Sequence, residues 1–370
     1  MKFRWGIFFF AFYLYRCGLS IYAQAMISNL GDTSTYHTGG RGTTPGFVEM
    51  ISASRPLEAT GLRAFGTAIT ETVGVVLSQL TGGNPYLINI GFQTIAFVGL
   101  FRLLKSVEPK VRKPLSLLLL LPTFNIWTSI ASKEALVTFL FCMLLVVFSR
   151  MEKEGGRRYF LPSFLIVLLL VLKPHYAAAA VFLFSVASVC QRVKQRATVA
   201  FSLGLASLIP LFFLADRLDG FSQTVAGHFR TGAGTLTRAP YFSEPYDLFM
   251  KAPYGMFQSF FGPTVSEATV GALQMATFVE AVILVTVLLY LILRRLLDLG
   301  AYEVIVSGFT LFWILFPSYP FGIMNPGSAV RYRSGYLVFL LGVIVILMLG
   351  SLYRKDRNGR LERRDSTRTA

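Results

Sequence analysis

Residues 84–128 read NPYLINIGFQTIAFVGLFRLLKSVEPKVRKPLSLLLLLPTFNIWT, and this pattern decides the fold. Two long apolar runs flank a short basic stretch, Arg102 to Lys113. A run of about 20 apolar residues is long enough to cross a bilayer as a helix. Short connections rich in Lys and Arg stay on the cytoplasmic side of the membrane. The stretch therefore predicts two membrane-spanning helices joined by a cytoplasmic loop.

The same alternation recurs along the chain. Hydrophobic residues make up 54% of it and charged residues only 15%, and the mean hydropathy is +0.58. This composition excludes an ordinary soluble domain. We expect an all-α, polytopic transmembrane helix bundle of about ten helices with both termini cytoplasmic. The expected spans are 5–26, 84–104, 114–128, 133–150, 159–173, 176–191, 198–215, 269–294, 301–317 and 335–353.

The charges divide sharply between the two sides of this bundle. The side that we assign to the cytoplasm holds 23 Lys/Arg and 7 Asp/Glu, which accounts for the whole net charge of +16. Basic residues in short loops orient a membrane protein and meet anionic lipid. We therefore expect no nucleic-acid partner. The cytoplasmic segments are Lys2 and Arg4, 102–113, 150–158, 192–196, 294–298 and the tail from Arg354.

Residues 1–353 are expected to form one transmembrane domain, followed by a basic, disordered cytoplasmic tail at 354–370. Three outer segments are long: 27–83, 216–268 and 317–334. Within the first, apolar residues at helical spacing over 56–80 predict an interfacial helix on the outer leaflet. An eleventh span or a re-entrant helix is the alternative.

The N-terminal segment 1–25 could be a cleaved signal peptide, but Arg16 interrupts its apolar run. We therefore expect an uncleaved first helix. Several later spans are short. Either these helices are tucked inside the bundle, or the outer turns at 125–134 and 173–176 lie below the outer surface in a wet cleft, which we favour. Arg16 and Glu280, deep in predicted helices, are expected to pair with each other as scaffold.

Four clusters of polar residues fall on the outer side. Asp32 lies just after the first helix, beside Tyr36, where a carboxylate can act as a general base toward a sugar hydroxyl. Lys133 opens a helix that Ser132 can cap, and a helix N-terminus favours an anion such as phosphate. A neutral Lys133–Glu134 ion pair is the alternative. The other candidates for binding a phosphate or relaying a proton are Lys173, His175, Arg331, Arg333 and, in the 216–268 segment, His228, Arg230 and Arg238.

On these residues the chain resembles the GT-C integral membrane glycosyltransferases of bacterial envelopes, which use polyprenyl-phosphate-linked sugars. The resemblance rests on Gly31-Asp32 with Tyr36, the 56–80 segment, the turn from Trp127 to Glu134, Lys173-Pro-His175 and Arg331-Tyr-Arg333. It implies Asp32 as the acid near the acceptor and the basic residues as holders of the lipid phosphate. Because Thr33 stands where many relatives carry a second acid, a divalent metal is not favoured, and no cofactor is expected.

The resemblance implies transfer of a sugar from a polyprenyl-phosphate carrier to a glycan or lipid-linked acceptor at the outer face of the bacterial inner membrane. Other polysaccharide-assembly proteins would then be partners. A repeat-unit polymerase or ligase of the O-antigen type is an alternative with the same carrier. A lipid-linked saccharide flippase is an alternative of another class, and a transporter would place polar features near the bilayer midplane. A structural membrane protein is the last alternative.

Overall fold

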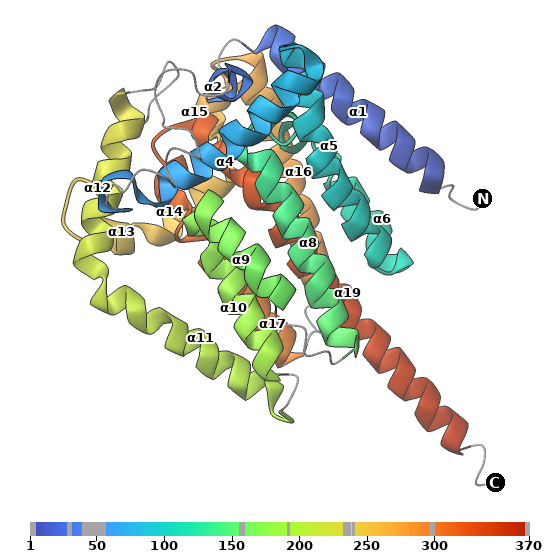
Figure 1. Cartoon of the computed structure of the whole chain (residues 1–370). Coiled ribbons are helices and arrows are strands. Elements are labelled where there is room, and N and C mark those ends of the chain that lie inside the picture. The colour runs from blue at the N-terminus through green and yellow to red at the C-terminus, as the bar shows by residue number, and fades with distance from the viewer. Residues whose placement is uncertain are drawn as a thin grey trace.

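The computed structural model describes residues 5–27, 32–38, 57–154, 160–190, 193–231, 238, 241–295 and 300–366. Every secondary-structure element in these ranges is a helix (Figure 1). The helices are α1 (Trp5–Met26), α2 (Thr33–Thr38), α4 (Leu57–Thr81), α5 (Pro85–Ser106), α6 (Pro109–Leu118), α7 (Pro122–Trp127), α8 (Lys133–Glu154), α9 (Phe160–Leu172), α10 (Pro174–Cys190), α11 (Arg196–Phe213), α12 (Ala215–Thr231), α13 (Asp247–Met250), α14 (Ala252–Phe261), α15 (Val265–Ala268), α16 (Ala272–Arg295), α17 (Ala301–Leu315), α18 (Tyr319–Gly322) and α19 (Pro326–Ser366).

The all-α expectation is confirmed for the described part of the chain. Among the residues that the structure describes, four helical stretches are long and apolar enough to cross a membrane: Trp5–Met26, Pro85–Ser106, Arg196–Phe213 and Pro326–Ile346. Shorter apolar helices cover Phe160–Leu172, Pro174–Cys190, Gln274–Tyr290 and Ala301–Leu315. The number of spans and the side on which each terminus lies stay predictions.

The centre of the bundle is α8, which packs against α5, α9, α10 and α19. Its apolar residues are almost entirely buried, as are those of α19 up to Val345. By contrast, α1 and α11 lie at opposite edges of the bundle and expose large apolar side chains such as Ile7, Phe10, Phe201 and Leu205 (Figure 1). Exposed apolar faces of this kind are what a lipid-facing helix presents.

The single span expected at 114–128 is wrong, because two short helices, α6 and α7, occupy it. Pro122 cannot donate a backbone hydrogen bond, and it holds Leu121 before it in an extended conformation (ψ 123°). Side chains satisfy the carbonyl groups that the break leaves. Asn125 Nδ2 donates to the carbonyls of Leu119 and Leu121, each at 2.8 Å, and Tyr15 Oη donates to Leu120 O at 2.9 Å.

The expected Arg16–Glu280 pair is also wrong, since both residues bind α7 instead. The buried Arg16 guanidinium donates to Asn125 Oδ1 at 2.6 Å and to Thr128 O at 2.8 Å. The Glu280 carboxylate accepts from the backbone N–H of Thr123 at 2.9 Å and from its hydroxyl. An irregular backbone among apolar helices must have its polar groups satisfied internally, and α7 supplies partners that the two charges would otherwise lack.

Two other segments are more helical than expected. The outer segment 216–268 contains α12 to α15, and helix α19 begins at Pro326, inside the outer segment 317–334 and nine residues before the expected span 335–353. Asn325 Oδ1 caps α19 by accepting from Ser328 N at 3.1 Å, and proline suits the first helical position. At its other end α19 continues to Ser366, where a disordered tail was expected. The reason is that Arg, Lys, Leu and Glu are good helix formers even where no apolar face is present.

The segment 56–80, expected as an interfacial helix, is α4. It runs obliquely across one end of the bundle and contacts α2, α5 and α9 (Figure 1). Gly74 allows a close approach here, because a Cβ at this position would lie 2.1 Å from the carbonyl oxygen of Tyr36. Helix α2, which follows Asp32, is thereby held against α4 at this end of the bundle.

Candidate functional site

Four charged side chains from distant parts of the chain meet at the end of the bundle that α4 crosses. Glu134 Oε1, in the first turn of α8, accepts from Lys173 Nζ at 3.1 Å and from Arg331 Nε at 3.2 Å. The other edge of the Arg331 guanidinium reaches Asp32, with 3.2 Å between Nη2 and Oδ2. We call Asp32, Glu134, Lys173 and Arg331 the Glu134 cluster.

The Glu134 cluster runs from the core to the surface. The exposed side-chain fraction rises from 0% at Glu134 through 9% at Lys173 and 17% at Arg331 to 63% at Asp32. A buried ion needs a partner, because removing it from water costs several kcal/mol. Glu134 neutralises only one of its two cations. Asp32 supplies the second negative charge from the open side of Arg331, which is where an incoming anion could replace it.

Local structure explains how Glu134 reaches this position. Ser132 Oγ accepts from the backbone N–H of Ala135 at 3.2 Å and so caps α8, as its sequence position predicts. Lys133 Nζ donates to Thr67 Oγ1 of α4 at 2.6 Å. Lys133 and Glu134 are neighbours in a helix, so their side chains point about 100° apart. Lys133 therefore ties α8 to α4, while Glu134 faces Lys173 and Arg331.

Aromatic rings line the cationic part of the cluster. The Lys173 ammonium lies 4.1 Å from the centre of the Tyr332 ring, and the Arg331 guanidinium lies 5.8 Å from that of Trp127. His175 stacks on Phe321 with 4.4 Å between ring centres and meets Tyr176 edge-on at 4.2 Å. The imidazole is thus packed among rings beside Lys173.

Helix α2 brings Tyr36 and His37 to the same end of the bundle. Tyr36 is 1% exposed, and burial, followed by the charge of Asp32, raises the pKa of its phenol far above the ordinary value. His37 Nε2 lies 2.8 Å from Asn89 Oδ1, and burial lowers the pKa of this imidazole. Both side chains are therefore neutral near pH 7. Tyr36 is placed to offer a hydroxyl near Asp32 rather than a charge.

Not every predicted site residue joins the cluster. Arg333 was expected to form a phosphate clamp with Arg331, but α19 is helical here and side chains two positions apart point about 200° apart. Arg333 is buried on the other face, where it donates to Phe260 O at 3.0 Å and Gly262 O at 3.4 Å. Arg238 forms a two-bond ion pair with Glu267 at 2.5 and 2.8 Å. The side chains of His228 and Arg230 lie outside the described part of the structure.

The residue at the centre of the cluster, Glu134, was considered in the sequence only as a partner for Lys133. A carboxylate at the start of a long apolar run is costly to bury unless a cation meets it. That cost is the signal that could have linked Glu134 to Lys173 and Arg331. Within the described ranges, no group of three or more His, Cys, Asp or Glu residues is arranged to hold a metal ion. The expectation that no metal takes part stays a prediction.

Comparisons with protein-family models, with curated proteins and with solved structures find no match to this chain.

Proposed function

We propose that this protein is a membrane glycosyltransferase that moves a sugar from a polyprenyl-phosphate carrier to a glycan or lipid-linked acceptor. The observation that carries the proposal is the ion pair between the exposed Asp32 and Arg331, backed by the buried Lys173 and Glu134. The ion pair places the Asp32 carboxylate, which can accept a proton, beside Arg331 and Lys173, which can bind a phosphate. A proton acceptor and a phosphate-binding cation are both needed when a hydroxyl displaces a phosphate from a sugar.

The charge balance of the cluster supports an exchange of anions. When the donor phosphate binds Arg331, it takes the place of the Asp32 carboxylate, and the cluster stays neutral without new buried charge. Arginine suits this exchange because its planar guanidinium binds carboxylate and phosphate in the same two-bond geometry. Asp32 is then free to accept a proton from the acceptor.

The reaction is a direct displacement. Asp32 takes the proton of the acceptor hydroxyl, and the hydroxyl oxygen forms a bond to the anomeric carbon of the donor sugar. The bond between that carbon and the phosphate oxygen breaks, and the electron pair leaves with polyprenyl phosphate. Arg331 and Lys173 stabilise the negative charge that develops on this leaving group. The sugar inverts at the anomeric carbon.

The separation of charges along the helices supports an active site on the outer face of a bacterial inner membrane. Glu134 begins α8 and Arg150 lies near its end, about 24 Å away at 1.5 Å per residue. The basic stretches 102–113 and 193–196 likewise fall at the helix ends remote from Glu134. Basic connections stay cytoplasmic, which leaves the Glu134 cluster outside.

A repeat-unit polymerase or ligase is the second candidate of the same chemistry. Phe321, which stacks on His175, also contacts Phe221 of α12 with 6.0 Å between ring centres. Helix α12 belongs to the long 216–268 segment and could carry a large acceptor toward the cluster. A flippase is less favoured, because the polar residues gather at one end of the bundle and not at its middle.

Mass analysis of lipid-linked saccharides tests the proposal. Cells that lack the protein should accumulate a polyprenyl-phosphate sugar, and wild-type protein but not Asp32→Asn should remove it. Glu244→Gln is the matched control, because Glu244 is an exposed carboxylate of the 216–268 segment. Normal lipid-linked saccharides in cells carrying only Asp32→Asn would count against a transferase. Accumulation of an unmodified saccharide on the inner side alone would favour the flippase.

A further inference from the structure

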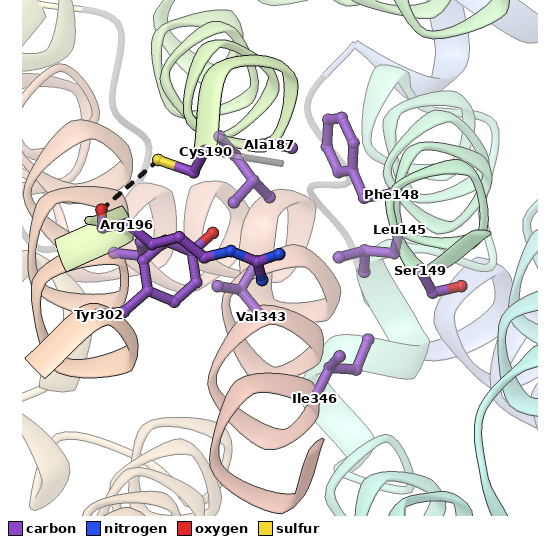
Figure 2. A pocket seen from close by; sticks show the side chains of 11 residues that line it. Leu145, Phe148, Ser149, Ala187, Cys190, Arg196, Tyr302, Val343 and Ile346 are labelled. Carbon is purple, nitrogen blue, oxygen red and sulfur yellow. Dashed lines mark hydrogen bonds between the residues drawn. The ribbon is translucent and has the colours of Figure 1, made fainter. Parts of the chain in front are cut away.

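A second cationic site lies at the other end of the bundle. A cavity of about 60 Å³ opens between the middle of α19 and the ends of α8, α10 and α17 that are remote from Glu134. Its walls are mainly apolar and include Leu145, Phe148, Leu183 and Val343. Figure 2 shows the guanidinium of Arg196, the first residue of α11, reaching across this cavity between Val343 and Leu145.

Arg196 has no anionic partner in the described part of the chain. The ion pairs of Lys173, Arg238, Lys251 and Arg331 do not include Arg196. Its backbone carbonyl accepts a weak hydrogen bond from Cys190 Sγ at 3.6 Å (Figure 2). Its guanidinium makes no hydrogen bond to another described residue. Arg196 is half-buried, so its guanidinium is open to water and to an anion that enters the cavity.

The cavity has the size and surroundings for a phosphate with a hydrocarbon tail. One water-sized atom needs about 10–15 Å³ of such volume, so roughly four to six fit, which is the size of a phosphate group. Outside the cavity, apolar side chains face away from the protein, with exposed fractions of 41% at Val189 and 47% at Phe201. A tail that leaves the cavity would lie along this apolar surface. Basic pockets between membrane helices are known to hold lipid headgroups.

We propose that the Arg196 cavity binds the phosphate headgroup of an anionic lipid, with its tail along α10 and α11. The site is distinct from the Glu134 cluster: on α19, 12 positions separate Arg331 from Val343, which is about 18 Å along the helix. The proposal does not depend on sugar transfer. It gives the protein a resident lipid at the end of the bundle opposite its candidate active site.

Native mass spectrometry of the full-length, detergent-solubilised protein with dioctanoyl phosphatidic acid tests this. The measurements use an Arg331→Gln background, so that lipid bound at the Glu134 cluster does not contribute. Arg196→Gln should weaken binding of this lipid about tenfold, as expected for loss of one charge-assisted contact. Lys194→Gln is the matched control, since Lys194 is exposed two positions away, and it should leave binding unchanged. Equal effects of the two variants would overturn the proposal.

Two further measurements separate the headgroup from the tail and from folding. Ala187→Phe, which fills the cavity and keeps Arg196, should weaken binding as Arg196→Gln does while the melting temperature stays unchanged. Dioctanoyl phosphatidylcholine, which carries no net negative charge, should bind less tightly than phosphatidic acid. If excess inorganic phosphate displaces the lipid fully, or if Ala187→Phe binds normally, the lipid site is refuted.

Discussion

Arg331 and Asp32 are 299 positions apart in the chain, yet Arg331 Nη2 and Asp32 Oδ2 lie 3.2 Å from each other. Arg331 is held from behind by Glu134, which also binds Lys173. The buried Glu134 therefore fixes the Arg331 guanidinium in place, and the exposed Asp32 carboxylate binds its outer edge. This arrangement lets the outer ion pair open without disturbing the inner one. The predictions on activity follow from that asymmetry.

Asp32→Asn should abolish sugar transfer and leave the amount of protein in the membrane unchanged. Loss of a general base lowers a rate about 100-fold or more. Asp32 is 63% exposed, and an exposed ion pair contributes at most about 1 kcal/mol to stability. The measurement is initial transfer rate in proteoliposomes with a polyprenyl-phosphate sugar, and Glu244→Gln serves as control. Full activity of Asp32→Asn would remove the proposed base.

Arg331→Gln should weaken donor binding by about tenfold or more, because a charge-assisted phosphate contact is lost. Arg331→Lys should recover part of this loss, since it keeps the charge without the two-bond geometry. Arg333→Lys should lower the melting temperature instead, because Arg333 holds the carbonyls of Phe260 and Gly262. The KM for donor and the KM for acceptor are measured separately. Donor KM rising as much in Arg333→Lys as in Arg331→Gln would contradict this division.

Glu134→Gln should destabilise the protein by about 3–5 kcal/mol, as removal of one partner of a buried ion pair does. The variant leaves Lys173 and Arg331 facing each other with only Asp32 as counter-charge. Adding Lys173→Met should restore much of the lost stability, because it removes one of the two cations. Unfolding in detergent is followed for both variants, with Glu303→Gln as control. An unchanged melting temperature in Glu134→Gln would show that its charge is not needed to hold the two cations.

The sequence was most informative where structure is local. The apolar runs of α1, α5 and α11 predict helices that the structure places within two residues of the expected ends. Pro122 interrupts residues 114–128, but the apolar residues around it are equally consistent with one continuous span. The partners of Glu134 could not be identified in this way. Lys173 and Arg331 are 39 and 197 positions away, and only the packing of α8 against α9, α10 and α19 brings them together.

The same limit explains the errors about Arg16, Glu280 and Arg333. Arg16 and Glu280 were expected to pair with each other, and Arg333 was expected to bind a phosphate; all three predictions assume correctly that a buried charge needs a partner. The partners turned out to be backbone carbonyls, amides and hydroxyls of α7 and α14, which any sequence contains in large numbers. A pattern of charges therefore indicates which side chains need a hydrogen-bond or ion-pair partner. It does not identify the partner.

The last prediction concerns pH and the 241–268 part of the outer segment. Burial raises the pKa of Asp247, but the Lys251 ammonium at 2.7 Å and the backbone N–H groups of Glu244 and Ser243 outweigh burial and lower this pKa to about 2. An aspartate whose folded pKa lies below its unfolded pKa stabilises the fold above the unfolded value, near pH 4, and loses this contribution as the pH falls toward 2. Asp247→Asn should therefore lower the melting temperature at neutral pH and make little difference near pH 2. The measurement is the difference in melting temperature between wild type and variant across this range, with Glu244→Gln as control. A difference that stays constant from neutral pH to pH 2 would show that the ionised carboxylate is not what holds this turn.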